Sequence, residues 1–235
     1  MALPSLNATP SYELTVPSTG DELKFRPFLV KEQKILMLAY ESQNKKQIIN
    51  AMIETLKSCV KDLDVSKLTT FDVDYIFTQI RAKSVGEKIE LKLPCSECET
   101  PNPVSVNLEN VEVAIEESEK IVKLTDQVSV KLKYPTYIDF MSRLGSMDNM
   151  SQTESIMEII ITCMDSVMTE EENISLRDES REEIMTFIES MNNQQFETVS
   201  QFVQDMPQLE YKITMTCFNC MHEEEKVLKG IDDFF

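Results

Sequence analysis

Two stretches of the chain share one pattern: Lys88-Ile-Glu-Leu-Lys-Leu-Pro-Cys-Ser-Glu-Cys98 and Glu210-Tyr-Lys-Ile-Thr-Met-Thr-Cys-Phe-Asn-Cys220. In each stretch, apolar and polar residues alternate, which predicts a β-strand with one buried face. Each strand then leads directly into a Cys-x-x-Cys pair. After the first pair the alternation returns at Val104-Ser-Val106, so the cysteines are expected at the tip of a β-hairpin.

The two cysteine pairs together predict one metal site. Structural zinc takes four tetrahedral ligands, and a Cys-x-x-Cys pair at a hairpin tip lets two thiolates converge on one ion. We therefore predict that Cys95, Cys98, Cys217 and Cys220 jointly bind one zinc ion. Because 118 residues lie between Cys98 and Cys217, far more than in a compact ribbon, we interpret the helices between them as an insertion.

Other uses of these cysteines remain open. A 4Fe-4S cluster also takes four cysteines. A thioredoxin-like redox pair would begin a helix, whereas Glu-Thr-Pro-Asn-Pro follows Cys98, so redox activity is less favoured. Four unrelated core cysteines would not explain the repeated pattern. Cys59 and Cys163 lie within helical patterns and are expected in the core. His222, the sole histidine, is expected at the surface instead of on the metal.

The N-terminal part predicts a β-hairpin followed by helices. Strand patterns at Tyr12–Val16 and Leu23–Phe28 flank a Pro-Ser-Thr-Gly turn. Residues 31 to about 61 lack proline and glycine and predict two helices. A third helix is expected from Thr69 to about Gly86, with Val73, Ile76, Phe77 and Ile80 on one face.

The central part predicts two strands and then four helices before Pro207. The strand-like segments are Ile121–Leu124 and Val128–Leu132. The predicted apolar helix faces are Tyr137, Phe140, Met141 and Leu144; Ile156, Met157, Ile160, Met164 and Val167; Ile184, Phe187, Ile188 and Met191; and Phe196, Val199, Phe202 and Val203.

The sequence thus predicts an α+β fold with an N-terminal β-hairpin, a mostly helical body and a zinc-ribbon-like module built from two distant Cys-x-x-Cys β-hairpins. Met147, Met150 and the apolar tail Ile231-Asp-Asp-Phe-Phe235 are candidates for contact with a neighbouring protein. The predicted segments are 1–30, the N-terminal β-hairpin; 31–86, helical; 87–134, the first cysteine knuckle and strands; 135–207, helical; and 208–235, the second cysteine knuckle and C-terminal tail.

Composition excludes several partners. A chain of 235 residues with 42% hydrophobic content can bury a sizeable core. Its formal net charge of −18 repels phosphate backbones, so nucleic acid is not expected as a partner. No apolar run is long enough to span a membrane, and the first residues lack the features of a secretory signal, so we expect synthesis in the cytosol and no membrane association.

An enzymatic activity is not expected either. The chain has one histidine and four glycines, and it lacks a Gly-rich phosphate loop, a G-x-S-x-G elbow and an H-E-x-x-H pair. Histidine is the side chain that most often transfers protons near neutral pH. We therefore expect neither catalytic residues nor a small-molecule substrate.

Two stretches carry a family resemblance: Pro17-Ser-Thr-Gly-Asp-Glu-Leu-Lys-Phe-Arg-Pro-Phe-Leu-Val-Lys-Glu-Gln-Lys-Ile-Leu36 and Phe71-Asp-Val-Asp-Tyr-Ile-Phe-Thr-Gln-Ile-Arg-Ala-Lys-Ser-Val-Gly86. They resemble the baseplate hub assembly protein family of T-even-like myophages. The resemblance runs over most of the chain and is strongest from Arg26-Pro-Phe28 to the first cysteine pair. It implies a small component of the baseplate hub of a contractile tail, and it implies no catalytic residues.

The resemblance leaves two roles open. One is a structural protein of the virion that bridges other baseplate hub, tail tube or tape-measure proteins. The other is a transient assembly chaperone that is absent from the mature virion. An oxidoreductase that uses the Cys-x-x-Cys pairs is the less favoured third. The expected location is the baseplate hub of the virion, and the host cytoplasm during assembly.

Overall fold

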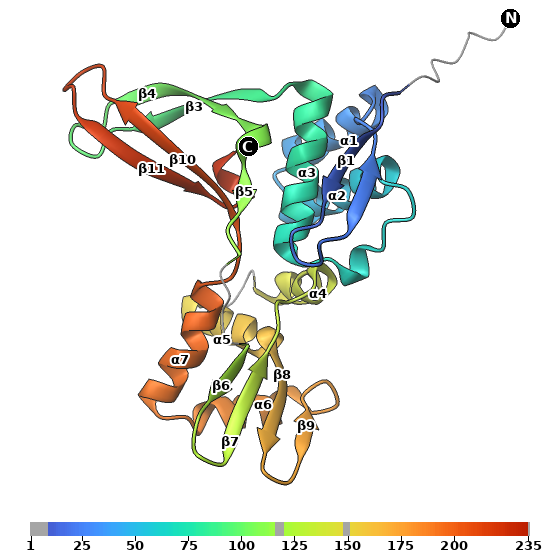
Figure 1. Ribbon diagram of the computed structural model, residues 1–235, viewed down its shortest axis with the longest axis vertical. Helices are drawn as coiled ribbons and strands as arrows, with labels where there is room; N and C mark the ends of the chain where they lie inside the picture. Colours follow the sequence, from blue (N-terminus) through green and yellow to red (C-terminus); the bar gives the residue numbers. More distant parts are fainter. Residues whose placement is uncertain (1–8, 116–119, 148–150, 235) are drawn as a thin grey trace, which may run out of the picture. The chain divides into compact units, whose positions relative to one another are not determined.

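The computed structural model describes residues 9–115, 120–147 and 151–234 (Figure 1). They divide into two compact units. The first unit contains the residues up to Val65, Phe71–Ala114 and those from Gln208 onward, and the second contains Ser66–Thr70 and Ile115–Pro207. The described part holds seven α-helices and four small antiparallel sheets. The predicted α+β class is therefore confirmed.

The first unit begins with the predicted β-hairpin. Strand β1 (Tyr12–Thr15) pairs antiparallel with β2 (Glu22–Phe25). In the turn, the Gly20 N–H donates to Val16 O at 2.9 Å, and Gly20 has a φ of 77°. Glycine adopts this left-handed conformation without steric cost, which explains its place in the turn.

Three helices follow the hairpin, as predicted. They are α1 (Val30–Glu41), α2 (Lys45–Cys59) and α3 (Thr70–Val85), with a short 3-10 turn η1 (Val65–Lys67) before α3. Helices α1 and α2 pack against each other. The predicted face of α3 is buried, because its apolar residues recur at helical spacing and all point into the core: Val73, Ile76, Phe77 and Ile80.

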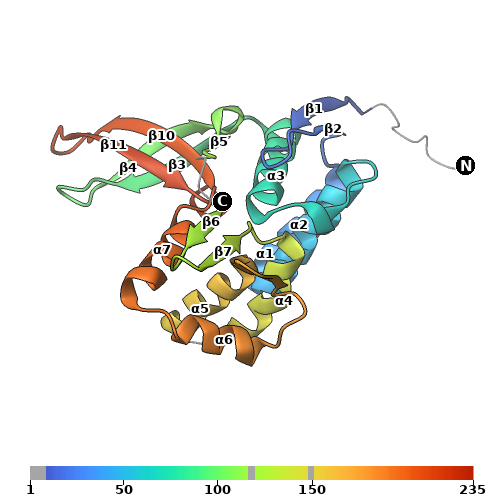
Figure 2. The ribbon, with the colours of Figure 1, turned by 60° about the horizontal axis from the view of Figure 1, so that its bottom comes forward.

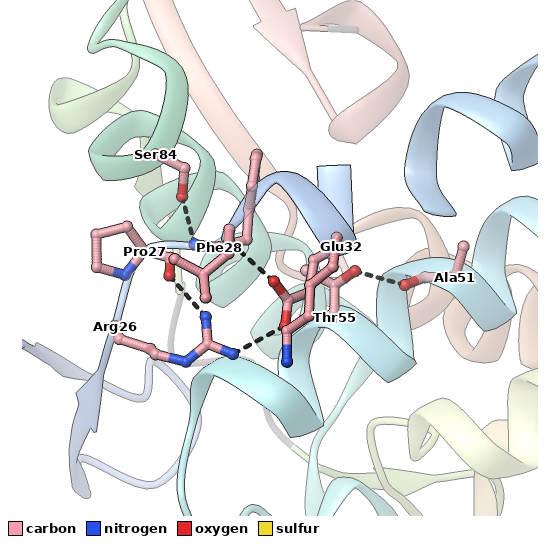
Figure 3. A network of polar contacts seen from close by, with 9 residues as sticks. Arg26, Pro27, Phe28, Glu32, Ala51, Thr55 and Ser84 are labelled. Atoms are coloured by element: carbon pink, nitrogen blue, oxygen red, sulfur yellow. Dashed lines mark hydrogen bonds and ion pairs between the residues drawn. The ribbon is translucent and has the colours of Figure 1, made fainter. Parts of the chain in front are cut away.

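A network of hydrogen bonds holds the segment between β2 and α1 in place (Figure 3). Arg26 Nη2 donates to Glu32 Oε1 at 2.8 Å, and the Leu29 N–H donates to Glu32 Oε2 at 2.8 Å. Glu32 is only 3% exposed. The Phe28 N–H donates to Ser84 Oγ on α3 at 2.9 Å. This segment, where the strongest part of the family resemblance begins, therefore joins the hairpin to two helices.

The two cysteine hairpins belong to the same unit. The first consists of β3 (Lys88–Pro94) and β4 (Pro101–Asn107), and the second of β10 (Leu209–Thr216) and β11 (Glu223–Lys229). They lie side by side with their tips together (Figures 1 and 2). Past a 3-10 turn η2 (Leu108–Asn110), strand β5 (Glu112–Val113) pairs with the start of β10. The chain thus connects the two hairpins before it enters the second unit.

The inward faces of the hairpins form a common core. Along β4, Val104 and Val106 are buried while Ser105 between them is exposed, as expected for a strand with one buried face. The buried residues of this core are Ala82, Ile89, Val106, Leu108, Val111, Leu209, Leu228 and Phe234.

The C-terminal segment corrects one prediction. The apolar tail was a candidate for contact with a neighbouring protein, but Phe234 is 1% exposed within the unit's own core. Phe235 lies outside the described residues. Strand β11 leads into a 3-10 turn, η3 (Ile231–Asp233), where Asp233 Oδ2 accepts a hydrogen bond from the Lys229 N–H at 2.7 Å. Met150 and the side chain of Met147, the other predicted contact residues, lie outside the described residues.

The second unit combines one sheet with four helices. The sheet has the order β6 (Ile121–Lys123), β7 (Val128–Leu132), β8 (Met164–Thr169) and β9 (Asn173–Ser175). The helices are α4 (Tyr137–Met147), α5 (Gln152–Cys163), α6 (Arg181–Glu189) and α7 (Asn193–Gln204). The last three begin with a capping box at a serine or an asparagine.

Strands β8 and β9 correct a second prediction. Met164 and Val167 were expected to continue the apolar face of α5, but α5 ends at Cys163 and the chain continues directly as β8. Val167 pairs with Val130 of β7 on one side and with Ile174 of β9 on the other. A continuous apolar run fits both a buried helix and a central strand, and here pairing on both sides selects the strand.

Candidate metal centre

The four predicted ligands come together at the tips of the two hairpins. The Sγ atoms of Cys95, Cys98, Cys217 and Cys220 all lie within 4.8 Å of one another. Cys95 Sγ is 3.7 Å from Cys220 Sγ, and Cys98 Sγ is 3.6 Å from Cys217 Sγ. Four sulfurs around one tetrahedral zinc, each at about 2.3 Å, are about 3.8 Å apart. The donor set therefore fits a single ion that both pairs share.

The same turn presents both cysteine pairs. We call residues 95–100 the first knuckle and residues 217–222 the second knuckle. In each knuckle the chain turns back on itself through two backbone hydrogen bonds that involve the first cysteine. These bonds run from the Glu99 N–H to Cys95 O (2.9 Å) and from the Cys95 N–H to Thr100 O (3.0 Å), and from the Met221 N–H to Cys217 O (2.9 Å) and from the Cys217 N–H to His222 O (2.8 Å).

The residue after the second cysteine has a left-handed backbone in both knuckles. Glu99 has a φ of 56° and Met221 a φ of 61°. Residues with a side chain adopt this conformation at a cost of about 1–2 kcal/mol. The knuckle turn therefore stores local strain at two equivalent positions.

Asn102 on β4 connects the first hairpin to the second knuckle. Its side chain is buried, its Oδ1 accepts from the Phe218 N–H at 3.0 Å, and its Nδ2 lies 2.8 Å from Thr100 O and 3.6 Å from Cys217 Sγ. An amide donor beside a thiolate stabilises the negative charge on sulfur. Asn102 was not predicted from the sequence, although a polar residue at an inward position of an alternating strand was a usable signal.

Two further side chains join the knuckles. Asn219 Nδ2 lies 3.7 Å from Cys98 Sγ and 3.2 Å from Thr100 Oγ1. Glu224 Oε1 accepts from the Ser96 N–H at 3.1 Å. Each knuckle is thus held by side chains of the other hairpin, which fixes the relative positions of the four sulfurs.

The surroundings shift the pKa values of the thiols in different directions. Hydrogen bonds from Thr100 lower the pKa of Cys98 to about 6, and the backbone N–H of Cys220 lowers the pKa of Cys217. The His222 N–H favours the Cys220 thiolate, but hydrogen bonding to Cys98, burial and the other thiols outweigh it and raise the pKa of Cys220 to about 12. A divalent cation among the sulfurs would favour the thiolate form of all four.

The two remaining cysteines lie elsewhere, in the core, as predicted. Cys59 and Cys163 are buried core residues, and burial raises their pKa values to about 11 and about 12. Such thiols are chemically inert. Within the described residues, His222 is not among the grouped ligands and contributes its backbone carbonyl to the second knuckle.

The arrangement suits a structural ion. Four thiolates fill a tetrahedral coordination shell and leave no position for a substrate or a reactive water. Both cysteine pairs lie between antiparallel strands and not at the start of a helix, which is where thioredoxin-like pairs gain their reactivity.

Comparisons with known proteins identify a family. No curated protein and no solved structure matches the chain. Among the described residues, no helix has the length and apolar character needed to cross a membrane. A family model described as T4 bacteriophage base plate protein matches residues 9–235, which include both cysteine hairpins. This family has a structural role in the baseplate of the phage tail, in association with other tail proteins. The chain therefore belongs to the T4 bacteriophage base plate protein family.

Proposed function

We propose that the chain is a non-enzymatic structural component of the baseplate hub that bridges hub, tail tube or tape-measure proteins. Family membership supports a structural role in the baseplate. The position in the hub is the part that we propose beyond it. The observation that carries the proposal is the closed four-thiol centre, because it joins two distant segments of the chain and offers no coordination position for catalysis.

We further propose that the centre holds one zinc ion. In a 4Fe-4S cluster each cysteine binds a different iron, so the four cysteine sulfurs must lie farther apart than sulfurs that share one ion. The cross-knuckle separations of 3.6 and 3.7 Å favour the single ion. Elemental analysis of the colourless purified protein should give one zinc per chain. A brown protein with iron and sulfide would instead support the cluster.

Exposed apolar side chains support contact with other proteins. Scattered exposed apolar residues are ordinary, but a group of them on one element indicates an interaction surface. Helix α1 carries such a group at its start and along its length: Val30, Ile35, Met37, Leu38 and Tyr40.

Quantitative mass spectrometry of purified phage particles tests the proposed role. A structural protein should be present at a fixed ratio to other baseplate proteins. Cys217→Ser should remove the chain from particles, whereas the control His222→Ala should leave incorporation unchanged, since only the His222 backbone takes part in the knuckle. Absence of the parent chain from particles, combined with an assembly defect when it is deleted, would support the transient chaperone instead.

A further inference from the structure

The equivalence of the two knuckles provides an internal comparison. Ser96 in the first knuckle corresponds to Phe218 in the second, and Glu99 corresponds to Met221. The two knuckles have the same hydrogen-bonded turn and the same left-handed position. The first knuckle forms this turn with a serine and a glutamate. Neither the turn nor the convergence of the sulfurs therefore requires apolar side chains in the second knuckle.

The second knuckle nevertheless exposes both of its apolar side chains. Phe218 is 65% exposed and Met221 is 71% exposed. The Phe218 backbone is fixed by the hydrogen bond to Asn102, so the ring extends from a rigid support. A rigid aromatic anchor contributes strongly to binding because little conformational entropy is lost, and methionine adapts to an irregular partner surface. Together these two side chains form what we call the second-knuckle tip.

Exposed acidic residues lie close in sequence to the cysteine pairs of both hairpins. Glu97 and Glu99 on the first knuckle and Glu223 and Glu225 on β11 are all exposed. Lys226 on β11 is engaged, since its Nζ lies 3.6 Å from Glu224 Oε2 and donates to Pro94 O. A second copy of the chain would bring the same acidic residues, and like charges at an interface are strongly unfavourable.

We propose that the second-knuckle tip inserts Phe218 and Met221 into an apolar pocket of a different baseplate protein, and that lysine and arginine side chains rim this pocket. Complementary charge on the partner would orient the encounter and exclude self-association. That the partner is a baseplate protein rests on the proposed function; the apolar, basic-rimmed chemistry of the pocket does not.

Site-directed photo-crosslinking in assembling phage tests the proposal. Phe218→benzoylphenylalanine should crosslink to a peptide that contains apolar residues and lysine or arginine, from a protein other than this chain. The matched control Ser96→benzoylphenylalanine places the same group at the equivalent position of the first knuckle and should give at least tenfold less product. The yield at position 218 should fall as salt is added before assembly, because salt screens the charged rim.

A double substitution provides an independent measurement. Phe218→Ser/Met221→Gln should lower the number of copies per particle at least tenfold while metal content and thermal unfolding stay unchanged. The control Ser96→Ala, at the position equivalent to Phe218, should leave incorporation unchanged. Equal crosslinking at positions 96 and 218, a crosslink to a second copy of this chain, or a crosslinked peptide without basic residues would each overturn the proposal. A crosslink of the predicted chemistry to a protein outside the baseplate would retain the docking surface and contradict the proposed function instead.

Discussion

The Sγ atoms of Cys98 and Cys217 lie 3.6 Å apart, although the two residues are 119 positions apart in the sequence. A bond through a shared ion closes a loop that contains most of the second unit, residues 115–207. Closing a long loop restricts the unfolded chain, and metal binding then contributes directly to folding.

Cys217→Ser should therefore loosen both knuckles and not only its own. Structural zinc contributes on the order of 10 kcal/mol of apparent binding free energy, comparable with the roughly 5–15 kcal/mol net stability of a domain. Hydrogen exchange should show lost protection near both Leu93 and Met215, while the helical circular dichroism signal largely remains. If the first knuckle kept its protection and its metal, the two pairs would not share one ion.

Glu99→Gly should stabilise the first knuckle. Glu99 has a φ of 56°, a conformation that glycine adopts without steric cost. Part of this gain is lost because glycine gives the unfolded chain more freedom, so we expect the free energy of unfolding to rise by up to about 1 kcal/mol. Glu99→Ala keeps the strain and serves as the control. Equal stability of the two variants in chemical denaturation would contradict strain at this position.

Glu32→Gln should destabilise the first unit and alter its response to acid. Burial alone would raise the pKa of Glu32, but hydrogen bonds from Arg26 and the Leu29 N–H outweigh burial and hold the pKa below its ordinary value of 4.5. The carboxylate thus contributes stability above about pH 4.5, which is lost as the pH falls. Glutamine leaves Arg26 without its charged partner, so we expect a loss of about 2–3 kcal/mol near neutral pH.

Thermal unfolding at neutral and acidic pH measures this effect. The difference between parent and Glu32→Gln should be largest near neutral pH and shrink below pH 4.5. Glu41→Gln, at the exposed end of α1, is the control and should change little. A difference that stays constant with pH would mean that the ion pair does not hold the Glu32 pKa down.

Asp74→Asn should have the opposite pH dependence. Burial, together with the negative charge of Asp232, raises the pKa of Asp74 from 3.8 to about 7. Between these values the folded protein holds a proton that the unfolded chain has released, so stability falls as the pH rises through this window. Asparagine is neutral throughout and avoids the loss. The gain in melting temperature over the parent should be larger at pH 8 than at pH 4. Equal gains at the two pH values would contradict a raised pKa of Asp74.

The sequence predicted that the four cysteines come together, because each knuckle is a local pattern, a strand that leads into a cysteine pair, and that pattern was present twice. Helix α3 was predictable for the same reason, since Val73, Ile76 and Ile80 recur at helical spacing and are buried. Strand β8 was not predictable from the sequence. The run before Met164 is apolar at nearly every position, and its period does not distinguish a helix from a central strand.

Other features depend on contacts between distant segments. Asn102 becomes a group that supports the sulfurs only when the second knuckle lies beside β4. Phe234 is buried because β5 and β11 flank β10 and build a core that reaches the C-terminal segment. The left-handed positions at Glu99 and Met221 carry no sequence signal, since glycine, the usual residue for such a turn, is absent from both.

The most direct test of the shared metal centre is X-ray absorption at the zinc edge of the purified full chain. We predict one zinc per chain with four sulfur neighbours at about 2.3 Å and no nitrogen or oxygen neighbour. A first shell with two sulfurs and lighter atoms, or a protein without zinc, would contradict the proposal that Cys95, Cys98, Cys217 and Cys220 hold one ion together.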